Sequence, residues 1–356
     1  MYKRIVIKVG TKVLSREDGS LDVKVMAHLV QEIVALKNKG TEIVLVSSGA
    51  VGAGRGLVAP RRRNRTANKQ VLAAVGQVKL MSTYAALLGK YDTLCAQVLA
   101  TKEDFRDRGH YLNMRSCFEQ LLSSGVVAIV NENDVVATTE LLFTDNDELA
   151  GLVASQLGAD AVIILTSVDG FMNGDPKNKH AKVVAEIDCD SIDRFRDCVF
   201  PDKTAFGRGG MLTKFDIAKK LALSGVEVHL ANGKAKNVIT DIISGKRVGT
   251  KFASGGKSSN LKRRIAYSEG LCKGSVRINR GAEELLVSKT KIMSLLPVGV
   301  TEVAGDFKKG DIVEIVGPSK KLGFGIAEYD AGRARELMGT KHARPVIHYD
   351  HMFIGV

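Results

Sequence analysis

The chain has 356 residues, of which 45% are hydrophobic and 26% are charged, a composition typical of a globular protein with two domains. Its longest apolar runs, such as GVVAIV at 125–130, are too short to cross a bilayer, which argues against a membrane protein. The N-terminal MYKRIVIKVG enters a strand-like run directly and lacks the features of a signal peptide, so a cytoplasmic location is expected.

The cysteine pattern and the distribution of charge further limit the class of protein. The five cysteines are scattered and contain no C-x-x-C pair, so we expect reduced thiols and no zinc site. The net charge is +13, yet residues 266–356 hold 13 basic and 11 acidic residues, so most of the excess lies before residue 266. A basic catalytic half suits anionic substrates and also weak polyanion binding. The basic run RRRNR at 61–65 is expected to be a solvated loop, with a role in the substrate pocket or a subunit contact as the alternatives.

Short β-branched runs alternate with amphipathic stretches over the first 250 residues. Strands are predicted at 4–10, 42–49, 93–99, 126–134, 161–170 and 226–233, and helices at 23–38, 69–88, 111–124, 147–157 and 213–224. This alternation predicts an α/β fold, an open and mostly parallel sheet with helices on both faces.

Polar residues follow five of these strands, in KVGT, SSGA, NEND, TSVDG and ANGK. Because ligands of open α/β sheets bind beyond the carboxyl ends of the strands, these residues are expected to converge on one site.

The sequence changes character after about residue 250. A segment rich in Gly, Ser and charge is followed by short β-type runs, namely SVRI, LLV, DIVEIV, FGIAEY, PVIHY and MFIGV. We therefore expect a catalytic domain at 1–260, a linker at 261–272 and a small β-rich domain at 273–356.

A glycine-rich stretch, AFGRGGMLTK at 205–214, suggests a loop that holds phosphates. It is not a P-loop, because Lys214 does not follow the second glycine directly, and it is not a dinucleotide fingerprint, because Leu212 stands where the third glycine belongs. A flexible surface loop is the alternative.

Two lysines and one aspartate are candidates for phosphoryl transfer, a reaction that needs charge neutralisation and alignment. Lys8 ends the first predicted strand and Lys214 follows the glycine loop, so the topology places both at the same sheet edge. Asp147 is a candidate to orient the lysines or to help place magnesium, and helix capping by TDND at 144–147 is its alternative role.

Six motifs together resemble the amino acid kinase family, and within it the glutamate 5-kinases. They are KVGT at 8–11, SSGA at 47–50, KQVLAAVGQ at 69–77, NEND at 131–134, DND at 145–147 and GRGGMLTK at 207–214. The resemblance covers essentially the whole chain, because residues from about 273 resemble the PUA domain that many bacterial members carry.

The resemblance implies a role for each matching position. Lys8 and Lys214 are expected to bind the ATP phosphates and stabilise the transferring group, with Asp147 organising them. The implied substrate residues are Ser48, Gly49, Asn131, Asp134 and Asn146. The implied nucleotide residues are Lys8, Gly10, Thr166, Ser167, Arg208, Gly209, Gly210, Met211, Leu212, Thr213 and Lys214.

The implied reaction is attack of the glutamate side-chain carboxylate on the γ-phosphorus of ATP, with Mg²⁺, to give γ-glutamyl phosphate for proline biosynthesis. A carboxylate is already ionised at neutral pH, so no general base is required. The resemblance further implies feedback inhibition by proline, a homo-oligomer, and transfer of the product to glutamyl phosphate reductase.

Several positions depart from the family pattern. Lys12 stands in place of a serine, Thr144 in place of a glycine, and Arg208 and Leu212 in place of smaller residues. Ser167 replaces a common aspartate, for which Asp169 is a possible substitute.

Two other functions compete with this interpretation: an RNA-binding protein acting through its PUA-like domain, and a kinase for another small acid. The near-neutral charge of that domain disfavours RNA, and its aromatic residues fit core packing better than base stacking.

Overall fold

The structure is a computed structural model, and it describes residues 2–59, 65–137, 143, 145–174, 178, 181–198, 210–256, 272–288 and 293–354. Several predicted features therefore lie outside the described residues, namely Arg61 to Asn64, Thr144, Arg208, Gly209 and all but the last residue of the expected linker at 261–272. The chain divides into two compact units, residues 1–102 with 112–257 and residues 103–111 with 258–356.

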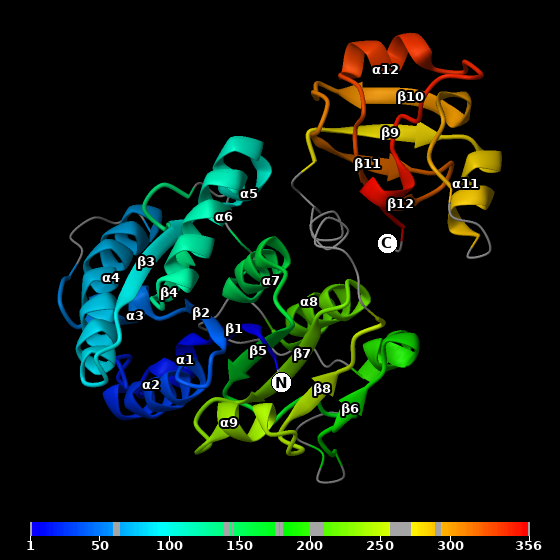
Figure 1. Ribbon diagram of the computed structural model, residues 1–356. Helices are drawn as coiled ribbons and strands as arrows, with labels where there is room; N and C mark the ends of the chain where they lie inside the picture. Colours follow the sequence, from blue (N-terminus) through cyan, green and yellow to red (C-terminus); the bar gives the residue numbers. More distant parts are fainter. Residues whose placement is uncertain are drawn as a thin grey trace. The chain divides into compact units, whose positions relative to one another are not determined.

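The first unit is built on an eight-stranded sheet in the order β3-β4-β2-β1-β5-β7-β8-β6 (Figure 1). Its strands are β1 (Arg4–Val9), β2 (Glu42–Ser47), β3 (Cys95–Ala100), β4 (Val127–Glu132), β5 (Ala161–Thr166), β6 (Glu186–Ile187), β7 (Glu227–Asn232) and β8 (Thr250–Phe252). Only the β7–β8 pair is antiparallel. The predicted fold class, a mostly parallel α/β sheet, is confirmed.

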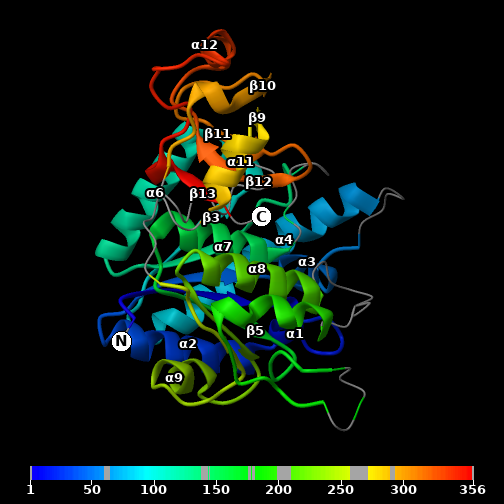
Figure 2. The same ribbon diagram turned by 90° about the vertical axis from the view of Figure 1, so that its right-hand side faces the viewer.

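Helices cover both faces of this sheet. They are α1 (Thr11–Leu14), α2 (Val23–Lys37), α3 (Ala50–Arg55), α4 (Arg65–Gly89), α6 (Arg108–Ser123), α7 (Asn146–Leu157), α8 (Met211–Leu223) and α9 (Val238–Ile243), with a 3₁₀ segment at Cys189–Cys198. Helix α5 (Lys102–Arg106) and the first four residues of α6 belong to the second unit, except for Lys102. Figure 2 shows α2 and α9 on one face and α7 and α8 on the other.

The alternation of side chains along β1 decides which residues reach which face. Ile5, Ile7 and Val9 lie in the hydrophobic core shared with α2, α4 and α9. Successive residues of a strand point to opposite faces, so Lys8 points to the other face, which α7 contacts. A buried lysine near the carboxyl end of an apolar strand is thereby directed toward helix α7.

Helix α4 packs very closely on α3. A Cβ on Gly76 would lie 1.8 Å from the backbone oxygen of Ala50, and one on Gly54 would lie 2.1 Å from that of Leu72. Only glycine allows backbones to approach this closely. Although the 24-residue stretch Thr66–Gly89 has the length and composition of a membrane span, Leu80, Tyr84 and Leu88 within it are buried in the core of this unit.

The second unit holds a five-stranded sheet in the order β10-β9-β11-β12-β13. Its elements are β9 (Gly274–Ile278), α11 (Arg280–Val287), β10 (Val300–Gly305), β11 (Ile312–Val316), β12 (Lys321–Ile326), α12 (Ala331–Leu337) and β13 (Met352–Ile354), with 3₁₀ turns at Pro297–Gly299 and Tyr349–His351. Phe307 and Phe324 are buried, as expected of core residues. The predicted small β-rich unit is confirmed.

Two predicted strands of this unit are wrong. The LLV run at 285–287 lies in helix α11, which the Asn279 side chain caps by accepting from the backbone N–H of Ala282. The PVIHY run forms only an isolated bridge, from Ile347 to Leu295. A short apolar run can form a strand or a helix, and for LLV the N-cap Asn279 favours the helix.

Candidate active site

Asp147 joins the two candidate lysines in one buried cluster. Its Oδ1 lies 2.5 Å from Lys8 Nζ, and its Oδ2 lies 2.9 Å from Lys214 Nζ. The three residues come from the first turn of α7, from β1 and from the first turn of α8. Asp147 is fully buried, and Lys8 is 5% exposed. The chain therefore holds two ammonium groups on one carboxylate, a cluster with a net positive charge.

The opposite charges in this cluster stabilise one another. Burial on its own would raise the pKa of Asp147, but Lys8 and Lys214 outweigh it and hold that pKa well below its ordinary value. Burial would likewise lower the pKa of Lys214, and Asp147 and Asp145 outweigh it and raise that pKa. Asp147 and Lys214 are thus both charged at neutral pH, as a site for an anionic group requires.

Asp145 positions the first turn of α7. Its Oδ1 accepts from the backbone N–H groups of Asp147 at 2.8 Å and Glu148 at 3.2 Å, the usual geometry of an N-cap. Burial, reinforced by the negative charge of Asp147, raises the pKa of Asp145 to about 7. The capping role that the sequence offers for TDND thus belongs to Asp145, and Asp147 is left to the lysines.

Gly10 keeps open the space beside Lys8. Its backbone N–H donates to the oxygen of Leu165 at 3.0 Å, which ties the end of β1 to β5. A Cβ on Gly10 would lie 3.6 Å from Lys8 Nζ and 3.4 Å from that same oxygen. A side chain at this position would therefore be in van der Waals contact with the ammonium group.

A second cluster consists of uncharged side chains. The Nδ2 group of Asn146 donates to Ser48 Oγ and to Asn131 Oδ1, both at 2.9 Å. Gly49 adopts φ +106° at the start of α3, a left-handed conformation that favours glycine and turns the chain directly after Ser48. The structure thus brings together four of the five predicted substrate residues.

Asp134, the fifth, is held by α4. Its Oδ1 lies 2.5 Å from Lys69 Nζ, and the neighbouring Gln70 donates to the backbone oxygen of Val135 at 2.9 Å. The end of the NEND motif is therefore attached to the first two turns of α4.

Apart from Lys8 and Gly10, the described residues predicted to bind the nucleotide lie at the C-terminal end of β5 and at the start of α8. Thr166 is the last residue of β5, and its backbone oxygen accepts from Gly233 at 2.9 Å. Ser167 is exposed, and Asp169 accepts from Asn232 at 2.9 Å.

At α8, Gly210 is the N-cap, followed by Met211, Leu212 and Thr213 in the first turn with Lys214. The Thr213 hydroxyl donates to the oxygen of Gly210 at 2.8 Å, while the Leu212 side chain is exposed. No group of three or more His, Cys, Asp or Glu suited to a metal ion occurs in the part of the chain that the structure describes.

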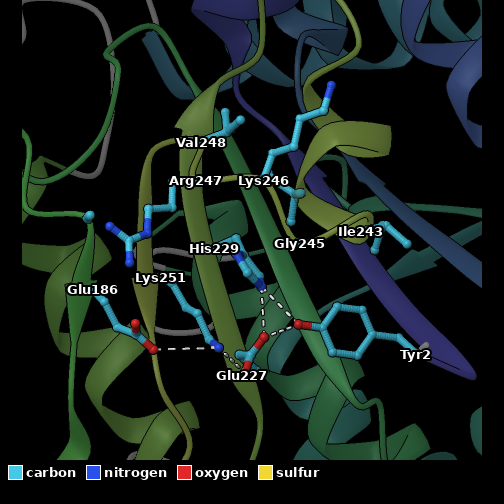
Figure 3. Close-up of a pocket in the computed structure, with 12 residues that line it drawn as sticks. Tyr2, Glu186, Glu227, His229, Ile243, Gly245, Lys246, Arg247, Val248 and Lys251 are labelled. Atoms are coloured by element: carbon cyan, nitrogen blue, oxygen red, sulfur yellow. Dashed lines mark hydrogen bonds and ion pairs between the residues drawn. The ribbon is translucent and has the colours of Figure 1, made fainter.

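A cavity of about 580 Å³ lies at the opposite end of the strands, where β1 and β7 begin (Figure 3). Tyr2, Glu227, His229 and Lys251 line it, and they are joined to one another. Glu227 accepts from Tyr2, lies 3.0 Å from His229 and 3.1 Å from Lys251. These groups satisfy one another and stand far along the strands from Lys8, so this cavity is not the site of phosphoryl transfer.

Three side chains near the site received no role from the sequence. They are Asp145, within DND, and Lys69 and Gln77, at the two ends of KQVLAAVGQ. Gln77 Oε1 accepts from Asn131 Nδ2 at 2.9 Å. Lys69 and Gln77 are eight residues apart, and this spacing places them on one face of α4, so helical periodicity was the available signal.

Two protein-family models match separate parts of the chain. The amino acid kinase family model matches residues 3–232, and the PUA domain model matches residues 274–349.

Curated relatives extend over nearly the whole chain. A glutamate 5-kinase of Chlorobaculum tepidum is 48% identical over 99% of this chain and 98% of its own length. One of Bacteroides thetaiotaomicron is 43% identical over 99% of both chains, and one of Thermoanaerobacter sp. is 39% identical over 99% of this chain and 97% of its own. A solved structure, a UMP kinase of Bacillus anthracis, is more distant, with 18% identity and a TM-score of 0.49 over 72% of this chain and 97% of that chain.

Proposed function

The chain belongs to the amino acid kinase family, and from its similarity to glutamate 5-kinases we propose how its residues share the work of phosphorylating glutamate. The activity is ATP-dependent transfer of a phosphoryl group to the side-chain carboxylate of L-glutamate, the first step of proline biosynthesis. The observation that supports the residue roles best is the Asp147 carboxylate between the ammonium groups of Lys8 and Lys214.

In the proposed mechanism the two lysines neutralise the phosphoryl group as it moves. A glutamate carboxylate oxygen forms a bond to the γ-phosphorus, and the bond from that phosphorus to the β–γ bridging oxygen breaks, so the electron pair leaves with ADP. Asp147 keeps both ammonium groups in place before ATP arrives, so little reorganisation is needed in the transition state. Gly10 admits the phosphates, and the start of α8 supplies backbone N–H groups.

ATP is expected to bring Mg²⁺ with it, and Asp145 is the carboxylate that best fits this ion. Asp147 is taken by the two lysines, whereas the hydrogen bond to Asp145 Oδ2 found among the described residues is a long one, 3.5 Å from the Thr213 hydroxyl. Mg²⁺ commonly uses one or two carboxylates together with substrate phosphates, so a site without a larger acidic cluster is suitable. When bound, the ion would neutralise charge on the phosphates.

The uncharged cluster is assigned to glutamate. Ser48, Asn131 and Asn146 offer hydroxyl and amide groups, Gly49 provides the turn, and Asp134 provides a carboxylate that suits the substrate ammonium. Thr166, Ser167 and the segment from Arg208 to Lys214 are assigned to the nucleotide. Proline, which is also an α-amino acid, is proposed to inhibit by occupying the glutamate site.

An exposed apolar stripe and the lability of the product each suggest a protein partner. Val71, Val75 and Val78 are exposed along one side of α4, and we assign this apolar stripe to a contact in a homo-oligomer. An acyl phosphate is labile, so direct transfer to glutamyl phosphate reductase is proposed. The free cysteines agree with a cytoplasmic location.

Trapping of the product tests the proposed function. The purified chain with ATP, Mg²⁺ and hydroxylamine should give a hydroxamate with L-glutamate and far less with aspartate or acetate. Lys214→Ala should lower kcat/KM, and the fall should correspond to a loss of about 3–4 kcal/mol of transition-state stabilisation, on the scale of a lost preorganised donor. Activity of this variant within roughly threefold of the parent would contradict the role of Lys214.

A further inference from the structure

A single ion pair joins the residues assigned to glutamate to the first turns of α4. Lys69 Nζ lies 2.5 Å from Oδ1 of Asp134, the residue assigned to the substrate ammonium. Among the described residues, Lys69 is the one cation that forms an ion pair or hydrogen bond with any of the five residues assigned to glutamate. The function proposed above gives this lysine no role.

Glutamate carries three charged groups, and the proposed site provides opposite charge for two of them. Its side-chain carboxylate faces the phosphoryl group at Lys8 and Lys214, and its ammonium faces Asp134. The α-carboxylate remains, and the uncharged cluster offers it hydrogen bonds but no positive charge. Because the α-carboxylate and the ammonium share one carbon atom, the α-carboxylate must lie next to Asp134, where Lys69 is found.

Both members of the ion pair have atoms left for a ligand. The Lys69 side chain is 36% exposed, and its ammonium group has three donors, of which Asp134 takes one. Oδ2 of Asp134 has no hydrogen-bond partner in the described part of the chain. A zwitterionic head group can therefore join the pair without breaking it, with its ammonium on Asp134 Oδ2 and its carboxylate on Lys69. Four charges of alternating sign would then lie side by side.

The ion pair lies at one end of a series of contacts through the site. Asn146, next in the chain to the carboxylate of the lysine cluster, donates to Asn131 at 2.9 Å. Three residues after Asn131 in the NEND motif, Asp134 meets Lys69. The neighbouring Gln70 donates to the backbone oxygen of the residue after Asp134 at 2.9 Å, which attaches α4 to this motif. From the lysine cluster outward, these contacts follow the order of groups in an extended glutamate, from side-chain carboxylate to head group.

We propose that Lys69 binds the α-carboxylate of glutamate and makes the site specific for α-amino acids. The proposal rests on the proposed function, and in particular on the assignment of Asp134 to the substrate ammonium. A ligand that has the ammonium but lacks the α-carboxylate brings a second cation close to Lys69 and no anion to balance it. Such a ligand is therefore rejected, and the rejection depends on the charge of Lys69.

Lys69→Met in the full chain tests this with two ligands. Methionine keeps most of the length of the side chain and removes its charge. The ligands are L-glutamate, measured by its KM, and 4-aminobutyrate, which is glutamate without the α-carboxylate, measured by its Ki against glutamate. The KM for glutamate should rise about 10–100-fold, the scale of a lost hydrogen bond between charged groups. The Ki for 4-aminobutyrate should stay within about threefold of the parent value or fall, and the KM for ATP should stay within about twofold.

Lys79→Met is the matched control. Lys79 lies on the same helix, is exposed, and has no ion-pair partner among the residues that the structure describes. The same exchange at this position removes one positive charge from α4 but none from the site. It should therefore leave the KM for glutamate and the Ki for 4-aminobutyrate at their parent values.

The comparison of the two ligands separates binding from a structural role. If Lys69 only holds Asp134 in place, both ligands lose their ammonium contact, and the KM and the Ki rise together. That result would overturn the proposal, and so would a KM for glutamate equal to that of Lys79→Met. Failure of the proposed function is recognised separately, because the parent chain itself would give no hydroxamate with glutamate.

Discussion

Asp147→Asn removes the charge between the two lysines and keeps the shape of the side chain. The parent carboxylate is fully buried and lies 2.5 Å and 2.9 Å from the two ammonium nitrogens. Asparagine would leave Lys8 and Lys214 as buried like charges, and breaking a buried ion pair in this way costs about 3–5 kcal/mol. For a unit of this size each kcal/mol lowers the melting temperature by about 2–4 °C, so a fall of about 6–20 °C is expected.

Thermal unfolding with and without nucleotide measures this change. The phosphates of ATP supply negative charge to the same lysines, so ATP should raise the melting temperature of Asp147→Asn more than that of the parent. The kcat should fall about 10²–10³-fold, because the lysines are no longer held in position before the reaction.

Asp193→Asn is the matched control, since it removes the carboxylate of an exposed pair with Lys219, for which about 1 kcal/mol or less is expected. A melting temperature of Asp147→Asn equal to that of this control, together with a parental kcat, would refute the role assigned to the buried carboxylate.

Two further predictions concern stability. Gly76→Ala should lower the free energy of unfolding by about 1–3 kcal/mol or more, because its Cβ would lie 1.8 Å from the backbone oxygen of Ala50. The control is Gly89→Ala on the same helix, whose Cβ would meet nothing within 4 Å, so it should be neutral or stabilising. Urea unfolding of the two variants measures the difference. Burial would raise the pKa of Glu227, but the adjacent imidazole and ammonium groups lower it below its ordinary 4.5, so its stabilising effect is present above that value and is lost as the pH falls through the folded-state pKa. Glu227→Gln should therefore lower the melting temperature by a few degrees at pH 7 and by less at pH 3, and an equal loss at both pH values would contradict this origin.

The sequence was sufficient to predict the strands of the first unit because their cores are continuous β-branched runs. RIVIKV and AVIILT are found as β1 and β5, within one to four residues of the predicted bounds. The short helices α1 and α3 escaped prediction because four and six residues hold too few turns to show a period. In the second unit, β10 has exposed residues at four of six positions, so it offered no apolar run to detect.

The site was predictable to the extent that strand ends converge. Lys8 was selected because it lies near the end of a strand, and NEND, which contains Asn131, was predicted to converge with KVGT; the sheet places both at one edge. The environments of Asp145 and Gln77 depend on partners far away in the chain: the pKa of Asp145 depends on burial, and Gln77 accepts a hydrogen bond from a residue 54 positions later. No local pattern contains that information. The residue roles themselves came from the family resemblance and stay predictions.

The first turn of α7 explains how the two halves of the site are kept in register. Asn146 and Asp147 are consecutive, and on a helix consecutive residues point about 100° apart. Asn146 faces Ser48 and Asn131, whereas Asp147 faces Lys8 and Lys214. The cap at Asp145 fixes the rotation of this turn, and therefore fixes both directions together. If the proposed roles hold, a glutamate at the uncharged cluster would lie beside a phosphoryl group held by the lysines, and any rotation of α7 would misplace both partners at once.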